Sequence, residues 1–190
     1  MKKLILFAAI LFAGVSIVKA DTPGATPSLT NSDNITLNVK LNPIQTLFIN
    51  PSHESVDLIY TNVKDYKEGV TLDKKDHLTV YSTGGFAINV NSSENDIKRA
   101  NGEQTIASST LSVQASLGTN NPLGGLFQGA TGVKLSTEKA TLFSHGKGGV
   151  DLAFNVKYSG IGADTYVNSY FKDENPTVYS TTVTYSIVAQ

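Results

Sequence analysis

The chain of 190 residues contains no cysteine and no tryptophan. Without cysteine it can form no disulfide bond, no thiolate metal site and no redox centre, so packing and backbone hydrogen bonds must stabilise the fold. The sequence also lacks apolar residues at helical spacing over three successive turns, which predicts that helix is a minor component.

The chain also has no large excess of positive or negative charge. The chain has 15 lysines and arginines against 16 aspartates and glutamates, a net charge of −1. Loss of Lys2, Lys3 and Lys19 with a signal peptide would make it −4. A mildly acidic chain lacks the basic face that nucleic acid or anionic lipid attracts, so we expect neither as a partner.

Sequence motifs of common catalytic sites are missing. No H-E-x-x-H zinc motif and no G-x-S-x-G nucleophile elbow occurs. The loop SHGKGG (residues 144–149) has Gly and Lys but leads into a strand, so it predicts a flexible hairpin loop rather than a phosphate site. His53, His77 and His145 are expected to be surface or structural residues, and only convergence in space could make them a metal site. We therefore predict no enzyme, no cofactor and no metal.

The first twenty residues have the pattern of a secretory signal peptide. Lys2 and Lys3 precede an apolar run over residues 4–18, and the sequence VKA predicts cleavage after Ala20. The run is shorter than the ~20 residues that cross a bilayer, so we expect no membrane span after its removal. The mature protein is then expected in the periplasm, on the cell surface or secreted. Residues 21–34, rich in Thr, Pro, Ser and Asn, predict a flexible tail.

From residue 35 onward, apolar and polar residues alternate with a period of two. Short alternating runs of this kind recur to residue 190 and predict one antiparallel β-sandwich domain over 35–190, immunoglobulin-like or pilin-like, with minor helix. The last alternating run covers residues 179–189. The charged stretch 64–76 and the glycine-rich stretch 119–132 predict loops. The first run places four apolar side chains on one face: Ile35, Leu37, Val39 and Leu41.

Both ends of the chain carry a resemblance. The segment NITLNVKLNP (residues 34–43) resembles the N-terminus of cysteine-free fimbrial subunits of the class 5 type, in which a mature tail leads into an alternating strand that ends at a proline. Residues 179–187 resemble the C-terminal strand of pilin-like sandwiches. This chain departs from many pilins because Val178 stands where a glycine is expected. The resemblance implies a structural or adhesive subunit that pairs strands with another copy of itself or with other envelope proteins.

The whole chain also resembles a group of small exported proteins of Bacteroidota. The shared segments are LNPIQT (residues 41–46), HLxxxSTGGF (77–86) and ENPTVYxTTVTYxI (174–187). Some members carry a peptidoglycan-binding label, although the βααβ pattern of a LysM domain is absent here. The resemblance implies the alternative function, a glycan- or peptidoglycan-binding module of the cell envelope.

The fimbrial resemblance gives residues 29–41 two possible roles. They are either an ordinary first strand of their own domain or a donor strand for a neighbouring subunit, with Leu29 or Ile35, Leu37, Val39 and Leu41 as anchors. The ordinary strand is favoured, because the alternating segment begins near the fold and the tail before it is polar. We therefore expect an exported, non-enzymatic structural or adhesive protein, with strand exchange left open.

Overall fold

The computed structural model describes three stretches of the chain: residues 31–53, 55–122 and 124–190. One compact unit spans Leu41–Gln190, and residues 31–40 lie outside it. The expected signal peptide, its cleavage after Ala20 and the start of the expected tail lie outside the described residues. No helix in the described part of the chain is both long and apolar enough to cross a membrane.

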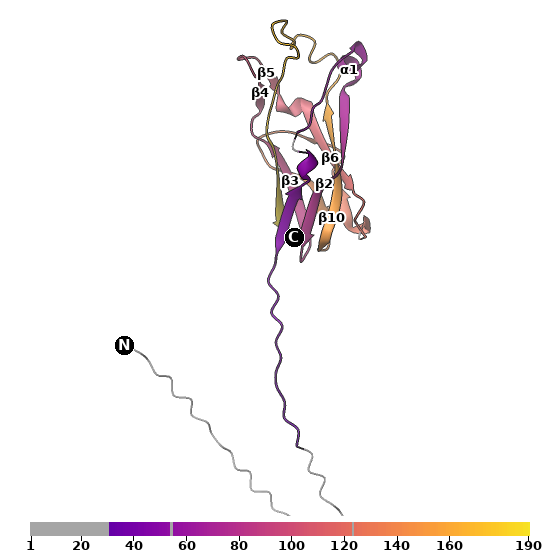
Figure 1. The fold of residues 1–190 in the computed structure, drawn as a ribbon, viewed down its shortest axis with the longest axis vertical. Helices are drawn as coiled ribbons and strands as arrows, with labels where there is room; N and C mark the ends of the chain where they lie inside the picture. The colour runs from indigo at the N-terminus through magenta and orange to yellow at the C-terminus, as the bar shows by residue number, and fades with distance from the viewer. Residues whose placement is uncertain (1–30, 54, 123) are drawn as a thin grey trace, which may run out of the picture. The chain divides into compact units, whose positions relative to one another are not determined.

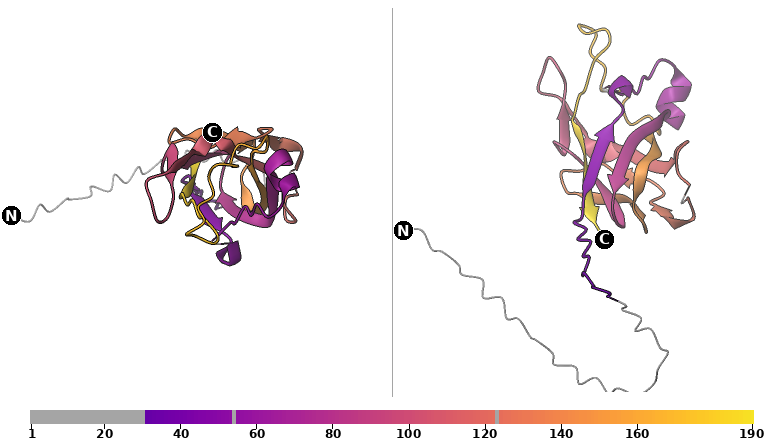
Figure 2. Two further views of the ribbon diagram at one scale, coloured as in Figure 1. Left: turned by 90° about the horizontal axis from the view of Figure 1, so that it is seen from above. Right: turned by 60° about the horizontal axis from the view of Figure 1, so that its bottom comes forward.

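Two antiparallel sheets pack face to face in the compact unit (Figures 1 and 2), which confirms the expected all-β sandwich. The first sheet contains, in spatial order, β1 (Gln45–Ile49), β2 (Val70–Ser82), β10 (Gly149–Gly160), β6 (Leu111–Leu117) and β8 (Val133–Lys134). The second contains β11 (Val183–Ala189), β3 (Phe86–Ser92), β9 (Ala140–His145) and β7 (Phe127–Gly129).

Helix is minor, as predicted. The α-helix of the described residues is α1 (Val63–Glu68), and the 3₁₀ turns are η1 (Pro51–His53), η2 (Ser108–Thr110) and η3 (Gly124–Leu126). A small hairpin is formed by β4 (Asp96–Lys98) and β5 (Thr105–Ala107). The hairpin and α1 lie at one end of the sandwich, and the C-terminus lies at the other (Figure 1).

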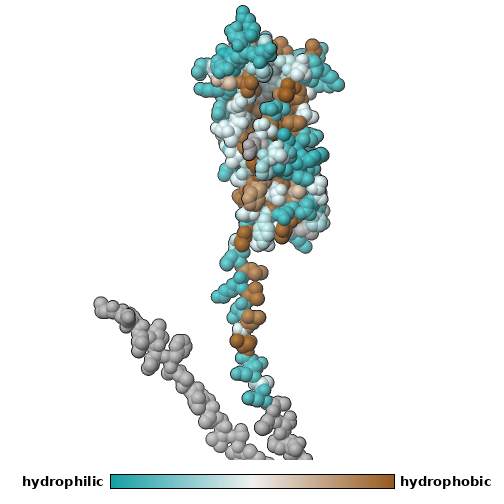
Figure 3. All heavy atoms as spheres, in the orientation of Figure 1, coloured by the Kyte–Doolittle hydropathy of each residue, from teal (hydrophilic) through white to brown (hydrophobic). Residues whose placement is uncertain are grey.

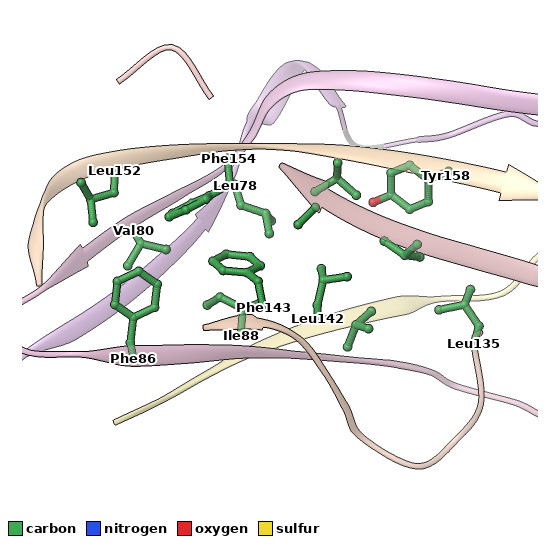
Figure 4. Close-up of a cluster of buried hydrophobic side chains, with 14 residues drawn as sticks. Leu78, Val80, Phe86, Ile88, Leu135, Leu142, Phe143, Leu152, Phe154 and Tyr158 are labelled. Atoms are coloured by element: carbon green, nitrogen blue, oxygen red, sulfur yellow. The ribbon is translucent and has the colours of Figure 1, made fainter. Parts of the chain in front are cut away.

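The hydrophobic core is filled by side chains from both sheets (Figure 4). Leu152 and Phe154 of β10 are buried and face the second sheet. Phe86 of β3 and Phe143 of β9 meet them, and the ring centroids of Phe143 and Phe154 are 4.4 Å apart. Burying one such side chain contributes about 1.5–3 kcal/mol, so packing of this kind supplies the stability that a disulfide-free fold needs.

The charged stretch 64–76 is a helix and a strand, so the predicted loop is wrong. The Asn62 side chain accepts hydrogen bonds from the backbone N–H groups of Lys64 and Asp65, and the Asp65 carboxylate accepts one from the N–H of Asn62. This reciprocal cap starts α1. Residues 70–76 then begin β2, and residues 70–74 pair with the end of β10. The period of two persists in the burial of these residues, but charged side chains occupy its partly buried positions (Lys74, Asp76) as well as its exposed ones (Asp73, Lys75). This run of charge is why the composition suggested a loop.

The glycine-rich stretch 119–132 is also more ordered than predicted. It contains η3 and β7, and β7 pairs with β9. Phe127 packs against the core, with its ring stacked at 6.0 Å from that of Phe154. A single large aromatic residue therefore anchors a segment whose glycines predicted an exposed loop.

Residues 31–44 form no strand. The intramolecular first strand that we expected there is absent. The side chains of Ile35, Leu37, Val39 and Leu41 are 94, 87, 77 and 88 % exposed. A period of two shows that one face of a segment requires burial, but it does not identify the chain that buries it.

We expect the compact unit to fold without residues 21–42. Residues 31–42 are exposed and form no strand, so their removal leaves the core unchanged. The Tm of a chain beginning at Pro43 should lie within about 2 °C of that of a chain beginning at Asp21, as measured by circular dichroism. A decrease of about 10 °C or more would show that the segment is part of the fold.

Candidate functional site

The strand β11 is an edge strand along its whole length. One side pairs with β3, from Val183 opposite Ser92 to Ala189 opposite Phe86. Among the described residues, no strand pairs with its other side. The free N–H and C=O groups on an edge of this length are a template for an additional strand.

The strand β1 is the edge strand of the other sheet. It pairs with β2 on one side, from Gln45 opposite Ser82 to Ile49 opposite Leu78. Its other side has no strand partner within the stretches that the structure describes. β1 and β11 lie side by side (Figure 2), yet they belong to different sheets. We call the boundary between these two strands the edge seam.

Apolar side chains line the edge seam without being fully covered. Val183, Tyr185 and Ile187 of β11 pack against the core and are half-buried, as is Leu47 of β1. The alternation of β11 was predicted, but the strand begins at Val183 rather than at residue 179. Half-covered apolar side chains at every second position are a surface that the side chains of an added strand can cover.

The residues predicted for strand exchange are exposed but are not paired. Ile35, Leu37, Val39 and Leu41 belong to a segment that has no strand partner in the described part of the chain. Figure 3 shows hydrophobic and hydrophilic groups in alternation along this extended segment. The alternation of the segment is visible in the sequence, whereas the seam could be recognised only once the strand order was known.

A chain of hydrogen-bonding side chains lies at the edge seam. His53 Nδ1 is 3.3 Å from His77 Nδ1, and His77 Nε2 is 2.8 Å from the hydroxyl of Tyr158. The Tyr158 hydroxyl is in turn 2.6 Å from that of Tyr185. These four residues come from η1, β2, β10 and β11, so the chain joins the two sheets. We call them the histidine–tyrosine chain.

Three members of the histidine–tyrosine chain, His77, Tyr158 and Tyr185, are uncharged at neutral pH. Burial lowers the pKa of His77 to about 4, assisted by the neighbouring His53 and Lys74. Burial also raises the pKa of Tyr158 to about 12 and that of Tyr185 further. Neutral, mutually hydrogen-bonded groups avoid the cost of burying a charge. The four residues are far apart in the sequence, so no spacing could have predicted this contact.

The third histidine lies elsewhere. His145 is fully buried, its Nδ1 is 2.8 Å from the carbonyl oxygen of Lys147, and its ring stacks on Phe86. Residues 146–148 connect β9 to β10, which belong to different sheets, so they do not form the hairpin that we expected. Within the described residues, no group of three His, Cys, Asp or Glu side chains is arranged to hold a metal ion.

Two acidic residues of the charged stretch, Asp65 and Asp76, have local structural roles. Asp65 caps α1 and borders a shallow pocket between residues 57–59 and the start of β2. Asp76 accepts hydrogen bonds from the backbone N–H and the hydroxyl of Thr119, and these bonds lower its pKa. Both carboxylates are thus occupied by nearby donors, and they do not face each other across a cleft.

Comparison with known proteins gives no family assignment: no protein-family model matches the chain, and no curated protein matches it.

Proposed function

We propose that this protein is a structural subunit that assembles by strand exchange, in which residues 35–41 of one copy pair with the edge seam of another. The supporting observation is a mismatch within one chain. The alternating segment has no strand partner, and β11 has an unpaired edge with half-covered apolar side chains, within the described residues. Pairing the segment with β11 would give the segment a strand partner and would cover the exposed edge of β11.

The free energy of this pairing depends on apolar burial, on the cost of association and on backbone hydrogen bonds. Burying four apolar side chains such as Ile35, Leu37, Val39 and Leu41 contributes about 6–12 kcal/mol in all. Association costs about 4–15 kcal/mol in lost translational and rotational freedom, before any ordering of the extended segment. The apolar contacts alone therefore only balance these costs. Backbone hydrogen bonds along β11 must supply the remaining affinity and fix the register.

The direct test is peptide binding to the compact unit. A fluorescently labelled peptide of residues 34–42, with blocked ends, should bind saturably and at one-to-one stoichiometry to a chain that begins at Pro43. A peptide of the same composition with its alternation scrambled is the control and should not bind. Fluorescence anisotropy measures both. Equal binding of the two peptides, or binding of neither, would contradict strand exchange.

The same preparation tests the alternative function. Saturable binding to purified peptidoglycan or to a glycan array, with no binding of the 34–42 peptide, would favour the glycan- or peptidoglycan-binding module. Binding of the peptide without glycan binding would favour the structural subunit.

A further inference from the structure

Among the described residues, the hydrogen bonds that hold the turn after β1 to the rest of the fold end on one residue. Two hydrogen-bonding contacts connect residues 50–53 with the body in the described structure, and both end on His77. The backbone N–H of Asn50 donates to the His77 carbonyl oxygen at 2.9 Å, and the ring of His53 contacts the ring of His77. The other hydrogen bonds of residues 50–53 lie within the turn.

This turn covers His77, and the ring of His77 lies beside β11. The ring centroid of His77 is 5.4 Å from that of His53 and 6.0 Å from that of Tyr185 on β11. His77 itself is 2 % exposed, whereas η1 contains no buried residue. Moving η1 away would therefore expose His77 beside β11. Because η1 has no buried side chain of its own, few contacts would be lost in the movement.

We propose that residues 50–53 are an acid-releasable cover of the edge seam, and that protonation of His77 releases it. This inference rests on the proposed function, because what the cover controls is the entry of a strand at β11. The titratable or charged groups that face His77 are the following, one from each element packed around it: His53 of η1, Lys74 of β2, Tyr158 of β10 and Tyr185 of β11.

No acidic group among the described residues compensates a positive charge on His77. In addition, His53 and His77 meet through the same ring atom, Nδ1, so the contact accommodates one proton between the two nitrogens but not two. A charged His77 is disfavoured under the cover because it is desolvated and lies near His53 and Lys74. Water solvates the charge better, and it reaches His77 only when the cover moves. Protonation therefore favours the open arrangement.

The size of the effect follows from the two pKa values. His77 has a pKa of about 4 when covered, and an exposed histidine has one of about 6.5. Between pH 7.5 and 5.0, the open arrangement should gain roughly 30-fold in population relative to the closed one. Acid should therefore accelerate strand entry.

The test measures the rate at which the 34–42 peptide enters a chain beginning at Pro43, at pH 7.5 and at pH 5.0. With blocked ends, Lys40 is the peptide's sole titratable side chain and stays charged at both values, so any pH dependence belongs to the protein. We expect the rate to be up to roughly 30-fold higher at pH 5.0. Stopped-flow fluorescence of the labelled peptide measures it.

Two variants assign the effect. H77Q keeps a hydrogen-bonding group for Tyr158 but cannot titrate, so its rate should be the same at both pH values. H53A removes the ring that covers His77 from a position that is only half-buried, so its rate at pH 7.5 should approach the wild-type rate at pH 5.0. A wild-type rate that does not change with pH, or an H77Q rate that changes as the wild type does, would overturn the proposal.

Amide hydrogen exchange separates this proposal from the proposed function. The exchange of residues 50–53, expressed relative to that of β3 at the same pH, should increase on acidification whether or not a peptide is present. Faster exchange of residues 50–53 in acid, without peptide binding at any pH, would support the acid-releasable cover and reject strand exchange. Peptide binding without that increase would support strand exchange and reject the cover.

Discussion

A chain beginning at Asp21 that carries both L37D and V39D should remain monomeric under conditions in which the wild-type chain forms polymers. Strand exchange would place these two side chains against the core at the edge seam. Each substitution loses about 1.5–3 kcal/mol of apolar burial and adds several kcal/mol, on the order of 3, for an uncompensated buried carboxylate. A total near 10 kcal/mol corresponds to a loss of affinity of roughly 10⁷-fold, which is effectively complete.

The matched control is the pair T36D and N38D. These substitutions lie in the same segment, add the same charge and occupy the opposite face, which would remain in solvent. We expect this variant to polymerise nearly as well as the wild type. Electron microscopy of negatively stained samples and gel electrophoresis of unboiled samples in sodium dodecyl sulfate measure assembly. If both double variants assemble equally, or both fail, the alternating face does not determine the interaction.

The sequence predicted the core of this fold because burial and periodicity coincide there. In β10, Phe154, Val156 and Tyr158 are buried, whereas Asn155 and Lys157 between them are only partly buried. The same reasoning failed at the start of β2, where Asp73, Lys74 and Lys75 gave the segment the composition of a loop. Residues 70–74 pair with the end of β10, so backbone hydrogen bonds and a few alternate apolar side chains hold this charged segment in a strand.

The candidate site could be predicted only in part. The face formed by Ile35, Leu37, Val39 and Leu41 is visible in the sequence, because it depends on local alternation alone. Whether β11 is paired on both sides depends on the order of the strands, which is set by contacts between distant segments. The contact between His77 and Tyr185 is of the same kind, since nothing in the residues around either position indicates that they meet.

Acid should reduce the free energy of unfolding in two separate pH windows, and His77 accounts for the first. Its pKa is lowered to about 4 by folding, so the unfolded chain, with a pKa of about 6.5, binds a proton that the folded chain does not. The contribution is fully present above pH 6.5 and is lost as the pH falls towards 4. Between pH 7.5 and 4.5 the loss should be about 2.5 kcal/mol.

The second window lies at lower pH, where carboxylates become protonated. Hydrogen bonds from Thr119 lower the pKa of Asp76, so the stability that this group contributes persists until the pH falls below its ordinary value near 3.8. The difference between the wild type and H77Q in urea unfolding at pH 7.5 and 4.5 therefore isolates His77. The H77Q variant should lack the loss of about 2.5 kcal/mol over this interval, whatever its stability at pH 7.5. If the wild type and H77Q lose the same stability, the buried histidine is not what makes the fold sensitive to mild acid.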